Sequence, residues 1–128
     1  MVRDWRSYLA QAFQDLTVWQ RAMEMTTSIY ALTRTFPQEE LYGLTTQLRR
    51  ASVSVASNIA EGRGRATDGE FRQFLGIAQG STFEVQTQLL VARQLGIGDK
   101  ALLKKAEALC IETSKMLNAF IQSLKAKG

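Results

Sequence analysis

The sequence predicts an all-α protein, an antiparallel up-and-down four-helix bundle. Apolar residues recur with helical spacing through most of the chain, and no stretch of any length alternates with the period of a strand. Four such helical stretches are joined by short connections, the pattern of an antiparallel bundle. With 128 residues and 45% hydrophobic content, residues 1–128 form one domain that can bury about two thirds of its unfolded surface.

The first predicted helix spans residues 17–36. Thr17 and Gln20 have the spacing of a capping box, and Pro37, the only proline, follows the last residue. Its buried side is expected to comprise Trp19, Met23, Thr26, Ile29, Tyr30 and Thr33. Residues 1–12 precede it as a short lead-in that we expect to dock on another surface, because it carries apolar residues at helical spacing. These residues are Trp5, Tyr8 and Leu9, continued by Phe13.

The second predicted helix, residues 44–62, has two apolar faces, whereas a lone amphipathic helix needs one. The core face comprises Leu44, Leu48, Ala51, Val55 and Ile59. The second, shallow stripe comprises Val53, Ala56 and Ala60. Small side chains let another backbone approach closely, either inside the bundle or in a neighbouring subunit, and the helix alone does not distinguish the two.

The third predicted helix spans residues 67–95. The glycines of Gly62-Arg63-Gly64 end the preceding helix, since glycine tolerates a left-handed exit, and Thr67 with Glu70 forms a capping box. The core stripe comprises Phe71, Leu75, Ala78, Thr82, Val85 and Leu89, and a second face comprises Ile77, Val91 and Leu95. Gly76 and Gly80 each cost about 1 kcal/mol relative to alanine, which suggests close packing or an ordinary internal contact.

The fourth predicted helix spans residues 99–125, with Asp99 as its N-cap after the turn at Gly98. It has the cleanest coiled-coil-like seam of the chain. The seam comprises Leu102, Ala106, Leu109, Thr113, Met116, Leu117, Phe120, Ile121 and Leu124.

The net charge is +4, and the isoelectric point near 9.5 permits contact with nucleic acid or another acidic partner. Many ordinary proteins share this balance, and basic clusters are usually solvated surface. The arginines that outnumber nearby acids are Arg49, Arg50, Arg63, Arg65 and Arg72. A second basic cluster comprises Lys100, Lys104 and Lys105.

The residue types argue against catalysis. The chain has no histidine, so it lacks the commonest general base and the Glu-x-x-His pairs of a di-iron bundle. Gly62-x-Gly64 lacks the further residues of a dinucleotide loop or a P-loop and follows a helix rather than a strand. We therefore expect no catalytic residue, no metal site and no cofactor.

The single cysteine, Cys110, lies among periodic apolar residues, which favours a buried core residue over a reactive thiol. One cysteine allows no intrachain disulfide, which fits a reduced, cytoplasmic setting. The N-terminal ten residues have no long apolar run, and no stretch reaches the 18 or so apolar residues of a membrane span. We expect a protein that is neither exported nor membrane-spanning.

Several short motifs of the chain are characteristic in combination. They are Asp15-Leu16-x-Val18-Trp19, Tyr42-Gly43-Leu44, Gln47-Leu48-Arg49-Arg50-Ala51, Ser57-Asn58-Ile59-Ala60-Glu61-Gly62, Gly64-Arg65, Phe71 with Phe74-Leu75, Ala78-x-Gly80-Ser81 and Glu84 with Gln88-Leu89. These motifs resemble the 23S ribosomal RNA intervening-sequence protein family of bacterial four-helix bundles. The resemblance runs from Phe13 to Gly96 and is more distant to the accessory protein of diversity-generating retroelements. It implies an up-and-down bundle that assembles as a homopentamer. Ala56 replaces a proline that the family often has in the second helix.

The family resemblance does not settle an activity. We expect a non-catalytic, self-assembling bundle that binds RNA or DNA or acts as a scaffold, with the five arginines above as its nucleic-acid-binding residues. The expected oligomer interface comprises Val53, Ala56, Ala60, Ile77, Val91 and Leu95. The alternative is a protein-directed adaptor, for example for a reverse transcriptase or another polymerase, in which the basic residues only solubilise the protein.

Overall fold

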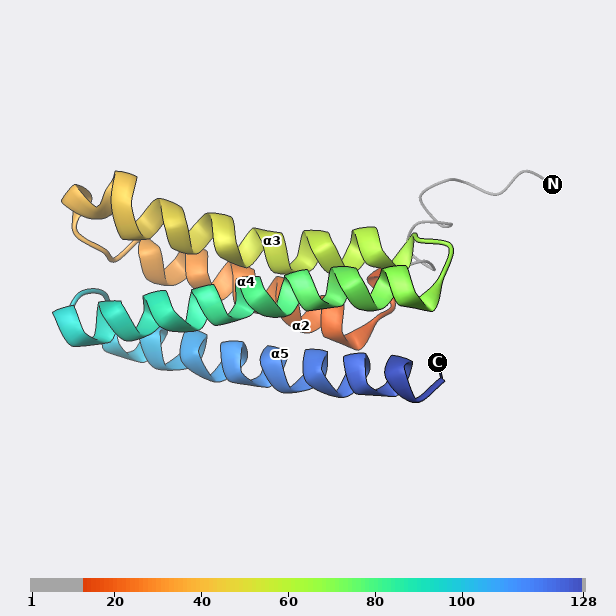
Figure 1. The fold of residues 1–128 in the computed structure, drawn as a ribbon. Coiled ribbons are helices and arrows are strands. Elements are labelled where there is room, and N and C mark those ends of the chain that lie inside the picture. Colours follow the sequence, from red (N-terminus) through yellow and green to blue (C-terminus); the bar gives the residue numbers. More distant parts are fainter. Residues whose placement is uncertain (1–12, 128) are drawn as a thin grey trace.

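The computed structural model describes residues 13–127, which contain four long helices and no strand. The helices are α2 (Thr17–Thr33), α3 (Thr46–Arg63), α4 (Asp68–Leu95) and α5 (Lys100–Lys127), with two short helical segments, η2 (Gln38–Glu40) and η3 (Leu41–Thr45), between α2 and α3. Figure 1 shows an antiparallel up-and-down bundle, as the sequence predicts. The predicted lead-in, residues 1–12, lies outside the described residues.

Each helix packs against its neighbours in the chain, and α5 closes the bundle against α2. The two ends of the bundle therefore differ. The η3 end holds η2, η3 and the α4–α5 turn, and the opposite end, the α3–α4 turn end, holds the start of α2 and the end of α5 (Figure 1).

The start of α2 differs from the prediction. Leu16 is the N-cap, with extended backbone and no side-chain cap, so Thr17 is the first helical residue rather than the capping residue. The Gln20 amide instead donates to the backbone carbonyl of Gln14 at 2.8 Å. The helix ends at Thr33, three residues before the predicted end, because the last residues before Pro37 form a tighter turn.

The second predicted helix begins at Thr46 rather than at residue 44, because η3 precedes it as one turn of π-helix. Gly43 interrupts η3 with φ −115° and ψ −111°, and the Glu40 carboxylate accepts a hydrogen bond from the backbone N–H of Leu44 at 3.3 Å. This local bond satisfies a donor that the interrupted helix leaves free.

The glycines at the end of α3 act differently from the prediction. Gly64, the C-cap, has φ −82°, so no left-handed exit occurs there. Gly62 is buried against α4, and a Cβ built on it would lie 2.6 Å from Phe74 Cβ. Close approach of two helices, rather than a turn, requires glycine at position 62.

The predicted caps of α4 and α5 are confirmed. Thr67 Oγ1 accepts a hydrogen bond from the Glu70 N–H at 3.1 Å, and Asp99 Oδ1 accepts one from Leu102 N–H at 2.9 Å. The α4 helix ends at Leu95, and its C-cap, Gly96, has the left-handed φ of +69°. The Asp99 N–H also donates to Thr35 Oγ1 at 2.9 Å, which ties the α4–α5 turn to the end of α2.

The core lies along the bundle axis and receives side chains from all four helices. On α3 the predicted core face is confirmed, with Leu48, Ala51, Val55 and Ile59 buried and Leu44 packed at the edge. On α2 the prediction was partly wrong, because Met23 is 39% exposed. The buried apolar residues of α2 are Val18, Ala22, Met25, Ile29 and Leu32.

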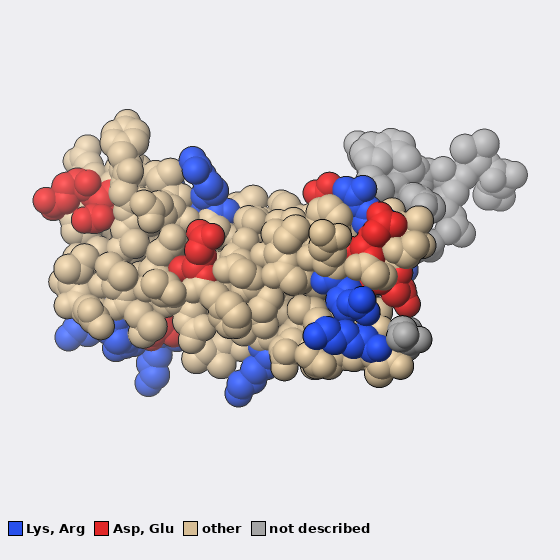
Figure 2. Space-filling model, in the orientation of Figure 1, with Lys and Arg blue, Asp and Glu red and all other residues tan. Residues whose placement is uncertain are grey.

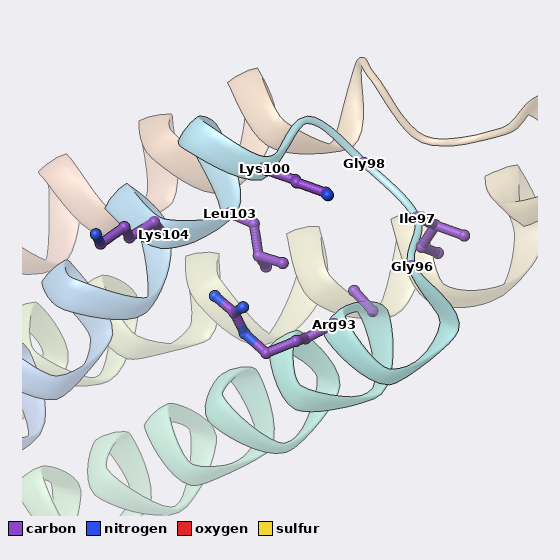
Figure 3. Close-up of a pocket in the computed structure, with 8 residues that line it drawn as sticks. Arg93, Gly96, Ile97, Gly98, Lys100, Leu103 and Lys104 are labelled. Carbon is purple, nitrogen blue, oxygen red and sulfur yellow. The ribbon is translucent and has the colours of Figure 1, made fainter.

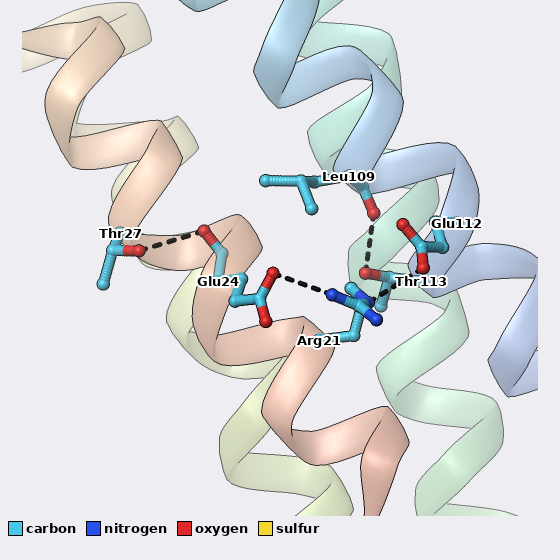
Figure 4. Close-up of polar contacts among 6 residues, drawn as sticks. All are labelled: Arg21, Glu24, Thr27, Leu109, Glu112 and Thr113. Atoms are coloured by element: carbon cyan, nitrogen blue, oxygen red, sulfur yellow. Dashed lines mark hydrogen bonds and ion pairs between the residues drawn. The ribbon is translucent and has the colours of Figure 1, made fainter.

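Polar contacts fasten α2 to its two neighbours. Thr26 Oγ1 lies 2.9 Å from the Ala22 carbonyl and 3.1 Å from the Ser52 carbonyl of α3. On the other side, the Arg21 guanidinium lies between two carboxylates, at 2.8 Å from Glu24 on α2 and 2.9 Å from Glu112 on α5 (Figure 4). These contacts fix the position of α2 against both α3 and α5.

Candidate functional site

The outer face of α4 carries the first candidate surface. Ile77, Val91 and Leu95, predicted as part of a subunit interface, are 49%, 41% and 60% exposed. They are therefore not buried within their own bundle, which excludes one of the two explanations that the sequence left open for this face. Few charged side chains lie along the middle of the face that Figure 2 shows, which includes α4.

Two large apolar residues on α4 were missed by sequence reasoning. Phe83 is 52% exposed and Leu90 is 50% exposed. They follow Gly76 at successive intervals of seven residues, so the three share one side of the helix. The seven-residue spacing was visible in the sequence. The positions of the neighbouring helices were needed to show that Phe83 and Leu90, which lie beside Ile77 and Val91 on α4, are exposed rather than buried.

Gly76 and Gly80 also lie on the outer face of α4. A Cβ built on either residue would meet nothing within 4 Å. The expected close packing of these glycines is therefore absent within the subunit. We define the α4 outer face as the exposed surface formed by Gly76, Ile77, Gly80, Phe83, Leu90, Val91 and Leu95.

A second apolar surface is a groove between α2 and α3, with a volume of about 330 Å³. We define the α2–α3 groove by its lining residues, Phe13, Trp19, Met23, Thr26, Val53, Ala56, Ser57 and Ala60. Val53 is 43% exposed in it and Ala60 is half-buried, but Ala56 is only 6% exposed and belongs to the core. The expectation that Ala56 offers interface area was therefore wrong.

The six residues expected to form one interface lie on two separate surfaces. Val53 and Ala60 face the groove on the α2 side of α3, whereas Ser54 on the other side of α3 contacts Ser81 of α4, with their hydroxyl oxygens 3.0 Å apart. Helical periodicity places residues on a face of one helix, but it does not place one helix relative to another. This limit explains why the sequence merged the two surfaces.

The five candidate arginines also divide into two groups. Arg49 and Arg50 lie in the first turn of α3, near the η3 end, and Arg63, Arg65 and Arg72 lie near the α3–α4 turn. Thirteen residues of helix separate Arg50 from Arg63, which is about 20 Å at 1.5 Å per residue. The expectation of a single basic cluster was therefore wrong.

Two of these arginines have partners within the subunit. Arg49 Nε donates to Thr33 Oγ1 at 2.9 Å, and its guanidinium lies 4.6 Å from the ring centroid of Tyr30, so it joins α3 to α2. Arg65 forms an ion pair with Glu61 at 2.8 Å, and its guanidinium lies 4.6 Å from the ring centroid of Phe74. Both side chains therefore have structural contacts that explain their presence without a ligand.

The other three arginines, Arg50, Arg63 and Arg72, have no ion pair with any residue in the range 13–127. Arg63 and Arg72 lie at the α3–α4 turn end, where acidic side chains are also present (Figure 2). The surface there is mixed in sign rather than uniformly positive, which limits the electrostatic attraction of an anion to the arginines that project from it.

A hollow of about 300 Å³ lies between the end of α4 and the start of α5 (Figure 3). Lys100 and Lys104 of the second predicted basic cluster line it, together with apolar residues such as Leu103. Arg93 at its edge donates two hydrogen bonds to the Glu107 carboxylate, one of them at 2.9 Å, and these bonds lower the pKa of Glu107. The hollow offers cations and an apolar floor, and its lining residues carry no carboxylate, hydroxyl, thiol or imidazole group.

Cys110 is the only thiol and lies fully in the core, as predicted. Burial raises its pKa to about 12, and its Sγ lies 3.5 Å from the Thr82 carbonyl oxygen. The thiol is therefore protonated at neutral pH and is a poor nucleophile. Within residues 13–127, no three residues of the His, Cys, Asp and Glu types are grouped so that they could hold a metal ion.

Among the helices of residues 13–127, none combines the length and apolar character that crossing a bilayer requires.

Comparison with known proteins supports the fold and assigns the family. No curated protein matches the chain. A crystal structure of a protein of unknown function from the S23 ribosomal protein family of Bacteroides thetaiotaomicron matches with a TM-score of 0.72 and 21% identity, over 82% of this chain and 98% of that chain. The model of the family described as 23S rRNA-intervening sequence protein matches residues 14–119, which include all of α2, α3 and α4 and most of α5. On this match, the chain belongs to the 23S rRNA-intervening sequence protein family.

Proposed function

We propose that this protein is a non-catalytic helical bundle that assembles with copies of itself, as a homopentamer, and presents basic residues to nucleic acid. The observation that carries the proposal is the α4 outer face. Five large apolar side chains there are between 41% and 60% exposed. Contiguous exposed apolar surface of this kind is typical of protein interaction sites.

The exposed glycines of α4 support a helical partner on this face. Each glycine in a helix interior costs about 1 kcal/mol relative to alanine, and no contact within residues 13–127 compensates for Gly76 or Gly80. Without side chains at these positions, another backbone can approach α4 closely. A second copy of the protein would bury the apolar residues beside them, at about 25 cal/mol per Å² of apolar area.

The presence of two different apolar surfaces supports a ring rather than a two-fold dimer. A closed ring needs a head-to-tail contact, in which one surface of a subunit meets a different surface of the next. The α4 outer face and the α2–α3 groove lie on different sides of the bundle and meet this requirement. The number of five subunits comes from the resemblance to the intervening-sequence proteins.

Nucleic-acid binding is the second part of the proposal. Arg63 and Arg72 lie close to one end of the bundle and have no ion pair within the described residues. In a ring each subunit would present this end with the same orientation, so that phosphate contacts that are weak individually would add up. Arg50, at the other end, would contribute only to a ligand long enough to span about 20 Å.

The test of this part is an electrophoretic shift assay over a salt series with single-stranded RNA and DNA. The double variant R63E and R72E is expected to bind more weakly and with a smaller salt dependence, since fewer counterions are released. The matched control is K104E with K105E, which changes the charge equally at the other end of the bundle. Undetectable or salt-insensitive binding by the unchanged protein would contradict nucleic-acid binding.

The mixed charge at the α3–α4 turn end favours an adaptor function as the second candidate. Glu61, Asp68 and Glu70 lie there beside the arginines, and Glu61 already pairs with Arg65. A surface with both signs suits a protein partner, for example a polymerase such as a reverse transcriptase. A pull-down after nuclease treatment separates the two functions, because only a protein partner remains bound.

A further inference from the structure

A knob of exposed side chains lies at the η3 end of the bundle. Tyr42 is 93% exposed and Leu41, beside it, is 42% exposed. The two residues before them are acidic, Glu39 and Glu40, and neither has an ion pair within residues 13–127. We define the η3 knob by these four residues, Glu39, Glu40, Leu41 and Tyr42. A tyrosine with so few contacts in its own subunit is typical of a binding surface, since tyrosine is enriched where one protein meets another.

Local hydrogen bonds hold the η3 knob in one conformation. The Glu40 carboxylate accepts a bond from the Leu44 N–H at 3.3 Å, and the Thr46 hydroxyl donates one to the Leu41 carbonyl. The two bonds close the turn that carries Tyr42. A side chain presented on such an ordered turn loses less conformational entropy on binding than one on a loose loop.

The hollow between the end of α4 and the start of α5, which we call the α4–α5 hollow, is complementary to this knob. Lys100 and Lys104 line it beside the apolar Leu103 (Figure 3). Because Arg93 already donates to Glu107, the two lysines are the lining cations that have no ion pair within residues 13–127. Two ammonium groups match the two carboxylates of the knob, and both an apolar floor and a nearby cation attract an aromatic ring.

The η3 knob and the α4–α5 hollow lie at the same end of the bundle but on opposite sides. Both α2 and α4 pack between α3 and α5, so the side formed by α2 and α3 is opposite the side formed by α4 and α5. The knob connects α2 to α3, and the hollow lies between α4 and α5. Figure 2 shows acidic side chains at one edge of this end and basic side chains at the other. The knob therefore does not reach the hollow of its own subunit.

The two features continue the two surfaces that the proposed ring uses. The hollow begins at Gly96, directly after Leu95 of the α4 outer face, and the knob joins the two helices that form the α2–α3 groove. Where the bundle axes run along the axis of a ring, the same ends of neighbouring subunits lie level, and the knob of one subunit faces the hollow of the next. We propose that the η3 knob of each subunit docks in the α4–α5 hollow of a second copy, an inference that rests on the proposed self-assembly.

The charge of the η3 knob favours a second copy over nucleic acid as its partner. Phosphate groups would meet the carboxylates of Glu39 and Glu40 beside the Tyr42 ring, and like charges that face each other oppose binding. The lysines of the hollow are of the opposite sign and are present on every copy. The contact is therefore one that the chain supplies for itself.

Cysteine cross-linking of the full-length chain tests the contact. The variant with Q38C and K104C has one exposed cysteine beside the acidic residues of the knob and one that lines the hollow. The control variant combines Q38C with K115C, an exposed position on the same side of α5 about 16 Å further along the helix. Native Cys110 stays in place, because its buried thiol, with a pKa of about 12, does not react.

The knob and hollow pair is expected to link chains into a ladder at least about tenfold faster than the control pair, as measured on non-reducing gels at micromolar protein. Equal rates for the two pairs, with an unchanged protein that assembles, would overturn this contact and leave the proposed ring intact. An unchanged protein that stays a single subunit would overturn both.

A charge exchange identifies the occupant of the hollow. E39K with E40K, and separately K100E with K104E, are each expected to raise the protein concentration of half-assembly at least about tenfold by light scattering. The chain with all four changes should regain assembly to within about threefold, because opposite charges again face each other. Circular dichroism checks that every variant remains helical.

Failure of the fourfold variant to regain assembly would overturn the proposal. An effect of K100E with K104E alone would also overturn it and assign the hollow to an anion other than the knob. Because K104E weakens the proposed contact, the nucleic-acid control of K104E with K105E is compared at a protein concentration at which light scattering shows it assembled.

Discussion

At the scale of single residues, glycine at position 62 is the clearest case in which packing dictates identity. A Cβ there would lie 2.6 Å from Phe74 Cβ and 3.0 Å from a ring carbon of Phe71. We expect G62A to lower the free energy of unfolding by about 1–3 kcal/mol, because α3 and α4 must separate. Urea denaturation followed by circular dichroism measures this change.

The matched control is G69A on α4, where the nearest atom to a new Cβ is 3.9 Å away. This variant is expected to be stabilised by up to about 1 kcal/mol, from helix propensity alone. Equal effects of G62A and G69A would show that the close approach of α3 to α4 does not limit position 62.

Also at the residue scale, the pair of Arg93 and Glu107 predicts a pH dependence. Hydrogen bonds from Arg93 lower the pKa of Glu107 in the folded protein below its ordinary value of 4.5. Stability from this pair is therefore fully present above that value and is lost as the pH falls through the lowered pKa. We expect E107Q to be less stable than the unchanged protein at pH 7.

The difference between E107Q and the unchanged protein should disappear in acid, since protonation removes the same charge that the substitution removes. Thermal unfolding of both proteins across a pH series measures it. A difference that persists unchanged below the lowered pKa would mean that packing of the side chain, and not its charge, explains the effect.

At the scale of one element, the α4 outer face makes a prediction about assembly. Ile77 is 49% exposed, so I77E should leave the fold intact, yet it would bury a charge in any subunit contact formed there. We expect I77E to remain helical by circular dichroism and to dissociate into single subunits by light scattering. The control Q122E makes the same charge change at an exposed position of α5. An I77E protein that assembles as the control does would exclude α4 from the interface.

The helices also show which features of an element hydrophobic periodicity predicts and which it does not. The core stripes of α3 and α4 and the caps at Thr67 and Asp99 were predicted, because they depend on spacing within a few residues. The start of α2 at Leu16 and the π-turn at Gly43 were not, because these ends depend on local hydrogen bonds that several sequences could form. The presence of a helix can therefore be predicted from its own residues, whereas the exact residue at which it begins or ends can be predicted only in part.

At the scale of the whole molecule, the proposed ring predicts a mass. Five subunits of 14.3 kDa give about 72 kDa, and multi-angle light scattering of the unchanged protein at micromolar concentration should report this value. A mass of 14.3 kDa over the whole accessible concentration range would contradict self-assembly. A dimer would contradict the head-to-tail geometry and would indicate that the same surface of both subunits forms a two-fold contact.

For the candidate sites too, the sequence predicted the helix face on which a residue lies but not how the helices pack around it. Each interface residue was assigned to a helix face from the sequence, and Val53, Ile77, Val91 and Leu95 are indeed exposed. Ala56 was misassigned because burial depends on how closely α2 packs on α3, which its own helix does not encode. The five arginines were grouped by type, although helix length places Arg50 and Arg63 about 20 Å apart.

The sequence by itself determined the four helices, their antiparallel order, most of the core stripes and the family, because hydrophobic periodicity and short motifs are local properties of the chain. Only the tertiary structure decided which apolar stripes stay exposed, that they form two separate surfaces, and which arginines are engaged within the subunit. These properties depend on how the helices are rotated and spaced against one another, and the packing of the complete core sets that arrangement.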